Sequence, residues 1–454
     1  MEEPQEVPAD EEHERVWERV AAVDIAKASG VVCTRVPDED RPGRRKTHVW
    51  TVQATSKAVI ELGDYLRARQ IQVVTLESTS GYWRIWFVIL EAAGLKVQLV
   101  NARHVKNVPG RAKTDKKDAV WLAKLTERGL LQPSFVPPPE IRRLREFTRL
   151  RTDLVRERTR YWARLEKLLE RAQIKISAVL SKLTTDTARA MIEALIGGQR
   201  NPKVLAELAI GKARSKRGEL AEALDGDWQP HHGELARILL DQIDALTAQI
   251  DALTDRVSEL IDQIPAAWGV DAGGVTGPQA GTGPDAVILP ALARLDEITG
   301  CGIIAAQAVI AEIGLDMTVF GTSGRLVSWA RRSPQTRQSG KKTTTGRAGK
   351  GNPYLNGMLG EIAASASRTD TFLGERYRRI ARRRGKRKAL AAIARSILVI
   401  IFHLLADPTA RFTDLGPGWY DNQIDAQRKT RGLIRQLEAL GHTVTLTPAG
   451  AAAA

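Results

Sequence analysis

The hydrophobic pattern between Val20 and Asn101 alternates short runs typical of strands with longer segments of helical spacing. The strand-like runs lie near 20–26, 30–36, 47–53, 71–77 and 96–101, and the helical segments lie near 56–68 and 81–93. The first three strands follow one another closely, joined by the turn-rich segment 37–43, which predicts an antiparallel meander ahead of a parallel part. The alternation as a whole predicts an α/β domain.

Helical spacing dominates from Glu140 to Ile264. One apolar seam alternates steps of four and three residues through Leu239, Ile243, Leu246, Ile250, Leu253, Val257, Leu260 and Ile264, which predicts a coiled-coil helix. An earlier helix has comparable spacing, but Arg151 and Arg158 lie on its seam, where they could face a partner or nucleic acid. The two helices could pair within one chain as an antiparallel hairpin or between chains, and periodicity alone leaves both open.

Three segments with different patterns follow these helices. Residues 268–288 are rich in Gly, Thr, Pro and Ala and predict a linker. The segment Ile298-Thr299-Gly300-Cys301-Gly302 precedes an apolar helix and predicts a helix-hairpin-helix, which presents backbone N–H groups to a phosphate, although an ordinary helix–helix turn fits equally well. The apolar segment 389–405 has 17 residues and contains Arg395, which favours a buried helix over a membrane span.

Composition narrows the partners of the chain. The 454 residues allow two or three domains, and 68 Lys and Arg against 53 Asp and Glu give a formal charge of +15. This balance favours nucleic acid as a partner; the alternative is that the chain is simply soluble and basic. Cys33 and Cys301 are too few for a disulfide framework or a zinc cluster, and they fit a reducing cytosol. The acidic N-terminal segment has neither the basic start nor the apolar stretch of a signal peptide.

Four carboxylates within the first 120 residues carry the first candidate chemistry. Asp24 and Glu77 each end an apolar run, so two buried strands would each deliver an acid at the carboxyl end. Asp115 and Asp118 are three residues apart, so one helical turn would place both on the same face. This set predicts a metal site for phosphodiester chemistry.

Basic residues gather in two later segments. Segment 331–351 has no acid and seven cations, namely Arg331, Arg332, Arg337, Lys341, Lys342, Arg347 and Lys350, which favours a phosphate-contacting loop. Segment 376–388 has nine, and its candidates for nucleic-acid contact are Arg382, Arg383, Arg384 and Lys386.

Ser339 lies within the first basic segment, beside Gly340 and two lysines. A hydroxyl in this setting is a candidate nucleophile, but a turn serine that only hydrogen-bonds the backbone fits the composition as well, since no histidine lies nearby to act as a base. No Gly-x-x-x-x-Gly-Lys-Ser/Thr loop is present, so ATP-driven chemistry has no support.

Together these motifs resemble the "one-ten" insertion-sequence transposases, the DEDD recombinases guided by a bridge RNA. The resemblance covers roughly residues 20–172 and 290–412. It rests on Val23-Asp24-Ile25-Ala26-Lys27, Glu77-Ser78-Thr79-Ser80-Gly81, Lys113-Thr114-Asp115-Lys116-Lys117-Asp118-Ala119, Gln338-Ser339-Gly340-Lys341, Gly349-Lys350-Gly351-Asn352-Pro353 and Arg382 to Arg395.

The resemblance implies a RuvC-like, ribonuclease-H-like N-terminal domain whose acids Asp24, Glu77, Asp115 and Asp118 bind Mg²⁺ or Mn²⁺. It also implies Ser339 as a nucleophile that forms a phosphoserine link to DNA, and sites completed across protomers of a dimer or tetramer. The expected partners are donor and target DNA and a structured guide RNA, without a membrane, in a nucleoid-associated cytoplasmic location. Two rival functions are a RuvC-like junction-resolving nuclease that uses water and a non-catalytic nucleic-acid scaffold.

The domains expected from all of this divide the chain into six parts: an arm at 1–18, the RuvC-like domain at 19–135, a helical coiled-coil region at 136–267, a linker at 268–289, a mainly α transposase domain with the helix-hairpin-helix at 290–412, and a tail at 413–454.

One departure from the resemblance stands out. Relatives usually show a Gly-Leu-x-Pro turn before the serine, whereas this chain has Ala330-Arg331-Arg332-Ser333-Pro334, which makes the approach to Ser339 more cationic. The linker also looks longer than is usual for the family.

Overall fold

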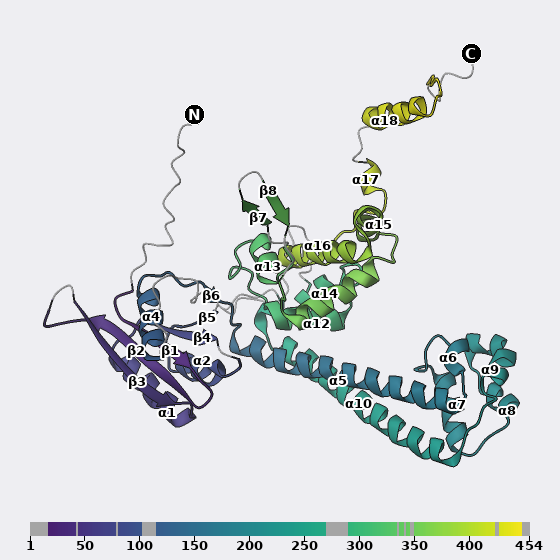
Figure 1. Cartoon of the computed structure of the whole chain (residues 1–454), viewed down its shortest axis with the longest axis horizontal. Coiled ribbons are helices and arrows are strands. Elements are labelled where there is room, and N and C mark those ends of the chain that lie inside the picture. The colour runs from purple at the N-terminus through teal and green to yellow at the C-terminus, as the bar shows by residue number, and fades with distance from the viewer. Residues whose placement is uncertain are drawn as a thin grey trace. The chain divides into compact units, whose positions relative to one another are not determined.

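The computed structural model describes residues 17–41, 44–78, 80–101, 115–268, 289–333, 336–339, 342–345, 349–422 and 426–446. It describes the backbone alone at 78, 115–116, 336–339, 342–345, 421–422 and 426–429. The chain divides into two compact units, Met1–Val136 and Pro137–Ala454 (Figure 1). Most of the predicted arm and linker lies outside the described residues.

A six-stranded sheet with the order β3-β2-β1-β4-β5-β6 forms the first unit. Its strands are β1 (Val20–Ile25), β2 (Ser29–Pro37), β3 (Arg45–Gln53), β4 (Val73–Ser78), β5 (Val97–Asn101) and β6 (Pro133–Ser134). The first three pair antiparallel, and β1, β4 and β5 run parallel. The predicted meander, its parallel continuation and the mixed α/β domain are therefore confirmed. Strand β6 has two residues, too few to show a hydrophobic period.

Helices cover both faces of this sheet. Helices α1 (Ser56–Ala68) and α2 (Trp83–Ala92) pack on one face, against Leu76 and its neighbours. Helix α4 (Asp115–Glu127) packs on the other face, where Leu122 is buried. Because alternate residues of a strand face opposite sides, strands β1 to β5 contribute to both cores. The central strands β1 and β4 read as nearly continuous apolar runs.

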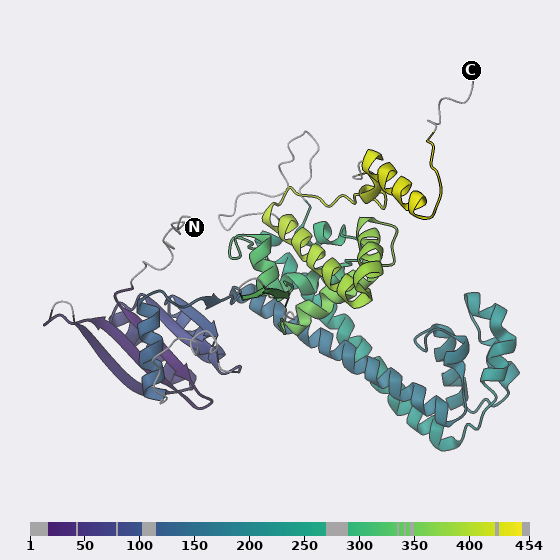
Figure 2. The ribbon, with the colours of Figure 1, turned by 45° about the horizontal axis from the view of Figure 1, so that its top comes forward.

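Two helices of 33 residues each, α5 (Pro139–Arg171) and α10 (Pro230–Asp262), begin and end the helical region of the second unit. They pack along each other within the chain (Figures 1 and 2). The predicted seam of α10 and the residues after it is buried or half-buried throughout, and its fully buried members are Ile243, Ile250, Val257, Leu260 and Ile264.

The two seam arginines of α5 fix the direction of this pairing. Arg158 donates to Thr247 Oγ1 at 3.2 Å and Arg151 to Thr254 Oγ1 at 3.5 Å. A step of seven residues forward on α5 thus meets a step of seven back on α10, so the helices are antiparallel. Arg151 is 3 % exposed and also donates to Gln307 Oε1 at 2.6 Å. Both arginines therefore contact the chain itself, which corrects the expectation of nucleic acid or a partner there.

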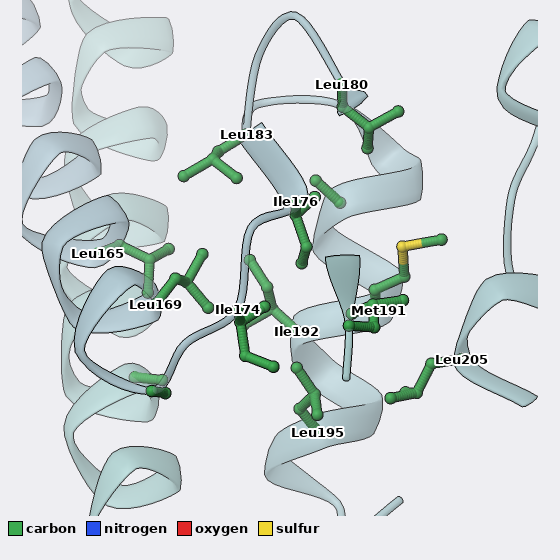
Figure 3. Packing of buried hydrophobic residues seen from close by; sticks show 14 of the residues in the cluster. Leu165, Leu169, Ile174, Ile176, Leu180, Leu183, Met191, Ile192, Leu195 and Leu205 are labelled. Carbon is green, nitrogen blue, oxygen red and sulfur yellow. The ribbon is translucent and has the colours of Figure 1, made fainter. Parts of the chain in front are cut away.

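A small helical bundle connects α5 to α10. Its elements are α6 (Ile176–Val179), α7 (Asp186–Ile196), α8 (Pro202–Glu207), a 3₁₀ turn at Gly211–Lys216 and α9 (Arg217–Ala223). Its core is continuous with the end of α5: Figure 3 shows Leu169 facing Ile174 and Ile192, and all three are at most 2 % exposed.

The C-terminal part of the second unit is mainly helical, as predicted. Its helices are α11 (Ala291–Asp296), α12 (Ile303–Ile313), α13 (Ser323–Trp329), α14 (Pro353–Ala366), α15 (Phe372–Arg384) and α16 (Lys386–Ala406). Helix α16 packs against α11, α13, α14 and α15 (Figure 2). It is long and apolar enough to cross a membrane by length and composition alone, yet its inner face, including Ile393 and Ile397, is fully buried here.

Two local features complete this part. Gly300, between α11 and α12, has φ of 83°, and a Cβ there would lie 2.8 Å from the Ala366 nitrogen of α14, so the turn requires glycine. Strands β7 (Thr336–Ser339) and β8 (Lys342–Thr345) form an antiparallel hairpin where the sequence predicts a loop, because four residues are too few to show a period. Helices α17 (Trp419–Asn422) and α18 (Ala426–Ala439) follow.

Candidate functional site

Asp24 and Glu77 lie at the carboxyl ends of two adjacent parallel strands. Strands β1 and β4 pair in register through Val23 and Leu76, and each acid is the next residue of its strand. Both side chains therefore lie on the face of the sheet that α4 covers. Glu77 is 6 % exposed and Asp24 is half-buried.

Helix α4 runs antiparallel to these strands. The backbone N–H of Trp17, just before β1, donates to the carbonyl of Glu127 at 2.9 Å, so the helix ends where β1 begins. Thr126 is hydrogen-bonded to Thr75 in the middle of β4, Oγ1 to Oγ1, at 2.7 Å. Asp118 is eight residues before Thr126, about 12 Å along the helix, toward the carboxyl ends of the strands. The start of α4 (Figure 1) thus lies at the edge that carries the two strand acids.

Asp115 and Asp118 occupy the first turn of α4 and share a face of the helix. Asp118 is half-buried, and the Asp115 side chain lies outside the described residues. Among the side chains that the structure describes, no three of Asp, Glu, His and Cys are close enough to hold a metal ion. The donor type nevertheless fits Mg²⁺ or Mn²⁺, since carboxylate oxygens are the ligands that these ions prefer.

A buried polar chain lies beneath the strand acids and has no counterpart in the sequence predictions. Gln98 Nε2 donates to Thr75 Oγ1 at 2.6 Å, and the same hydroxyl meets Thr126. Thr75 is fully buried and two residues before Glu77, so it lies on the same face. The two-residue spacing is visible in the sequence. The partner of Thr75 is not, because it lies 51 residues away.

Ser339 is in the second unit, whereas the four acids are in the first. It ends β7 and pairs with Lys342 of β8, so two residues separate it from the returning strand. Its side chain lies outside the described residues, as do those of Arg337, Lys341, Lys342 and Arg347.

The two arginines that precede the hairpin have different surroundings. Arg331 is exposed and has φ of 56°, in the left-handed region that favours glycine. Arg332 is half-buried and donates to the carbonyl of Asn356 at 2.6 Å, and burial lowers the pKa of its guanidinium. Arg332 therefore supports the fold, while Arg331 and Lys350 face solvent.

The second basic segment divides in the same way. Arg376 donates to Tyr420 Oη at 2.6 Å, and Arg378 pairs with Glu375 at 3.0 Å. In contrast, the cations around Gly385 are all exposed and form no ion pair with any described residue; they are Arg382, Arg383, Arg384, Lys386, Arg387 and Lys388. This cluster includes every candidate of the segment.

Two family models match the chain. A model described as "Transposase", for the DEDD transposase of IS110, matches residues 21–174. A model described as "Transposase IS116/IS110/IS902 family" matches residues 292–378. The first match contains the four candidate acids and the second contains Ser339, and together the two matches cover just over half of the chain. No curated protein matches the sequence significantly.

Solved structures of RuvC from Thermus thermophilus are similar to part of the chain. The structure of the protein itself matches at 13 % identity and a TM-score of 0.21, covering 26 % of this chain and 99 % of RuvC. Its complex with a Holliday junction substrate matches at 12 % identity with the same TM-score and coverage. A TM-score this low does not bear on the function of the chain.

Proposed function

Because the chain belongs to the IS116/IS110/IS902 family of transposases and is thus an enzyme that cleaves and rejoins DNA, we propose that it excises and inserts an insertion sequence by site-specific recombination. The observation that carries the proposal is that Asp24, Glu77 and the first turn of α4 meet at one edge of a sheet. The strand order β3-β2-β1-β4-β5 supports a RuvC-like, ribonuclease-H-like arrangement of this unit.

In this proposal the carboxylates hold Mg²⁺ or Mn²⁺ and are Asp24, Glu77, Asp115 and Asp118. A divalent ion bound there supplies charge that polarises the scissile phosphate. Ser339 Oγ releases its proton to water and attacks the phosphorus: the Oγ–P bond forms as the bond from phosphorus to the leaving deoxyribose oxygen breaks, and that oxygen takes up a proton from water. The phosphoserine bond retains the energy needed for rejoining, which distinguishes strand exchange from hydrolysis.

The remaining parts of the proposal concern nucleic acid and assembly. The antiparallel pair of α5 and α10 supports a coiled coil, and the turn between α11 and α12 supports a helix-hairpin-helix that contacts a phosphate. The acids and Ser339 lie in different units, which is compatible with a site completed between protomers of a dimer or tetramer. Donor DNA, target DNA and a structured guide RNA would be held mainly through backbone and shape.

The exposed cations around Gly385 support a phosphate contact by an independent argument. Lys386, Arg387 and Lys388 occupy the first turn of α16, where the helix dipole is positive. Each such cation is unfavourable by about 0.3–1 kcal/mol when nothing offsets it. A nucleic-acid phosphate at this turn would reverse the sign, because it meets both the cations and the free backbone N–H groups.

The direct test measures covalent protein–DNA adducts with Ser339→Ala, using Ser333→Ala as the control because it removes a hydroxyl from the segment before the hairpin. We expect adducts and recombination to disappear only in Ser339→Ala. Asp24→Asn should abolish strand exchange while DNA binding persists, and Asp64→Asn, on the exposed face of α1, should change neither.

Four outcomes discriminate the candidate functions. Adducts at the normal level in Ser339→Ala exclude Ser339 as the nucleophile. Cleavage that requires the acids but leaves no adduct favours the RuvC-like junction-resolving nuclease. Binding without cleavage under any metal condition favours the non-catalytic scaffold, and full activity in a chelator excludes the metal role.

A further inference from the structure

The base of the serine hairpin is closed by contacts between the segments that flank it. A Cβ added to Gly349 would lie 3.5 Å from Cδ of Arg331, so the arginine side chain passes directly over this glycine. A Cβ added to Gly351 would lie 2.5 Å from the carbonyl oxygen of Ala330, a distance that only glycine permits. The chain entering the hairpin and the chain leaving it are therefore packed together at 330–331 and 349–351.

Asn352 connects this base to two helices. Its Oδ1 accepts the backbone N–H groups of Tyr354 and Leu355 at 3.0 and 3.3 Å and so caps α14. Its Nδ2 donates to the carboxylate of Glu312, near the end of α12. The Asn352 side chain thus accepts two unpaired backbone N–H groups of α14 and also bonds α14 to α12 through Glu312.

Glu312 is a buried carboxylate, 1 % exposed, that two arginines of α5 hold in place. Arg149 binds both of its oxygens, at 2.8 and 2.9 Å, and this pairing raises the pKa of Arg149. Arg145 donates to the backbone carbonyls of Ala311 and Glu312 at 2.9 and 2.7 Å and caps the last turn of α12. Bidentate bonds between charged groups fix orientation as well as distance.

A second link joins α5 to the first turn of α14. Tyr354 Oη donates to Asp153 at 2.9 Å, and the guanidinium groups of Arg149 and Arg156 lie 4.9 and 5.3 Å from the centroid of its ring. Two routes of contact therefore connect α5 to the start of α14: one runs through Glu312 and Asn352, and the other through Tyr354.

Resting on the serine chemistry proposed above, we propose that Glu312 and Asn352 are positioning residues for Ser339. Thr345, the last residue of β8, is four residues from Gly349, at most about 14 Å of extended chain, so the position of the 349–352 segment limits where the hairpin can lie. A buried ionic cluster adds little net stability compared with apolar residues of the same volume. What this cluster provides is one defined position for the base of the hairpin, and hence for the serine relative to α5.

The test uses substitutions that separate capping from the Glu312 contact. Asn352→Ser keeps a capping oxygen but removes the donor to Glu312, Asn352→Asp keeps the cap and repels Glu312, and Asn352→Ala removes both. Thr185→Ala is the matched control, because it removes the cap of α7, where Thr185 Oγ1 accepts from the Ala188 N–H at 3.3 Å. The double variant Glu312→Gln/Asn352→Asp restores the hydrogen bond in the opposite direction.

Two measurements are made on the full chain: hydrogen exchange of the backbone amides of 336–345, and the single-turnover rate of adduct formation at saturating DNA. We expect Asn352→Ala, Asn352→Ser and Asn352→Asp to accelerate exchange in the hairpin and to lower the adduct rate by about 10- to 100-fold, as misplacement by about 1 Å can. DNA affinity should stay within about twofold, because the amide group that is removed is engaged within the chain by Glu312 and the first turn of α14. Thr185→Ala should change neither quantity, and the double variant should recover part of both.

The outcomes keep this inference apart from the proposed function. Unchanged hairpin exchange together with an unchanged adduct rate in Asn352→Asp overturns the positioning role. Recovery of both quantities in Asn352→Ser would show that the cap alone matters, which also overturns the role of Glu312. If the unmodified protein forms no Ser339-dependent adduct, the proposed function fails, and hydrogen exchange still decides whether Glu312 and Asn352 hold the hairpin.

Discussion

Thr126 of α4 and Thr75 of β4 are hydrogen-bonded to each other through their buried hydroxyls, at 2.7 Å. Thr75 is two residues before Glu77 on the same face of the sheet, and Thr126 is eight residues after Asp118 on the helix. A slip of α4 by one turn, about 5.4 Å, would break this bond and move Asp118 by the same distance relative to Glu77. The bond thus defines how the helix acid and the strand acid line up.

We therefore expect Thr126→Val to impair DNA cleavage more than DNA binding. The substitution keeps the shape of the side chain but leaves the buried Thr75 hydroxyl with one partner fewer, at a cost of about 1–3 kcal/mol in the free energy of unfolding. The rate of cleavage should fall by about tenfold or more if α4 becomes free to shift. Urea unfolding and single-turnover cleavage measure the two effects.

The control for this prediction is Thr159→Val. Thr159 lies on the exposed face of α5, and among the described residues its hydroxyl bonds only the carbonyl of Val155 four residues earlier, at 2.9 Å. Its replacement should alter neither stability nor cleavage appreciably. Equal cleavage rates in Thr126→Val and the unmodified protein would show that the threonine bond does not align the acids.

Glu127, the last residue of α4, should make the stability of the protein depend on acid pH. Burial on its own raises the pKa of this carboxyl, but hydrogen bonds from Arg35 at 2.6 Å and Arg45 at 2.5 Å bring it below its ordinary value. Because the folded-state pKa is the lower one, the stabilisation is complete above the unfolded-state value of about 4.3 and disappears as pH falls through the folded-state value.

Glu127→Gln should therefore lower the free energy of unfolding at neutral pH by about 1.5–3 kcal/mol. It should also flatten the dependence of the urea midpoint on pH below about 4.3, the ordinary pKa of a glutamate. Glu61→Gln, at an exposed position of α1, provides the control with the same change of charge. If the urea midpoint of Glu127→Gln falls at acid pH as steeply as that of the unmodified protein, other carboxyl groups account for the acid dependence of stability.

Part of the first unit could be predicted from the sequence because β1 and β4 are nearly continuous apolar runs, each with an acid at its carboxyl end. Asp24 and Glu77 could be assigned to strand ends, and the structure places those ends side by side. The bonds that align them could not be found, since Thr75 pairs with a residue 51 positions away and has no special local pattern. Arg151 shows the converse: a charge on an apolar seam suggests an external partner, yet Gln307 of α12 satisfies it within the chain.

Arg331 offers a case in which stability and activity should change in opposite directions. Its φ of 56° costs a residue with a Cβ about 1–2 kcal/mol. Replacement by glycine removes this cost, but the larger conformational entropy of glycine in the unfolded chain cancels part of the gain in stability. We expect Arg331→Gly to unfold at equal or higher denaturant concentration and to bind DNA more weakly, because the variant lacks an exposed cation beside Gly349.

Two further substitutions separate charge from backbone conformation at this position. Asn tolerates the left-handed region and carries no charge, so Arg331→Asn should weaken DNA binding as Arg331→Gly does. Arg331→Lys keeps the charge and the strain, and it should bind DNA nearly as the unmodified protein does. Binding measured by fluorescence anisotropy that is equal in all four proteins would remove Arg331 from the DNA-contacting residues.

The exposed cluster around Gly385 should determine the salt dependence of DNA binding. A variant with alanine at all four candidate positions, Arg382, Arg383, Arg384 and Lys386, removes up to four cations that can bind phosphate. Each cation that no longer binds a phosphate lowers the slope of log K against log salt by about 0.9 on duplex DNA. We therefore expect a slope smaller by about 3 to 4, with little change in the free energy of unfolding, because none of these side chains pairs with a described residue.

A variant that neutralises four exposed cations of the helical bundle and the adjoining end of α5, at Lys167, Arg171, Lys203 and Lys212, separates this effect from net charge. Net charge alone would reduce the slope equally in both variants. Phosphate binding localised at the junction of α15 and α16 would reduce it only in the first, since ions condensed on DNA are released by the cations that touch it. Equal slopes in the two variants would therefore assign the salt dependence to the overall charge of +15 and not to this junction.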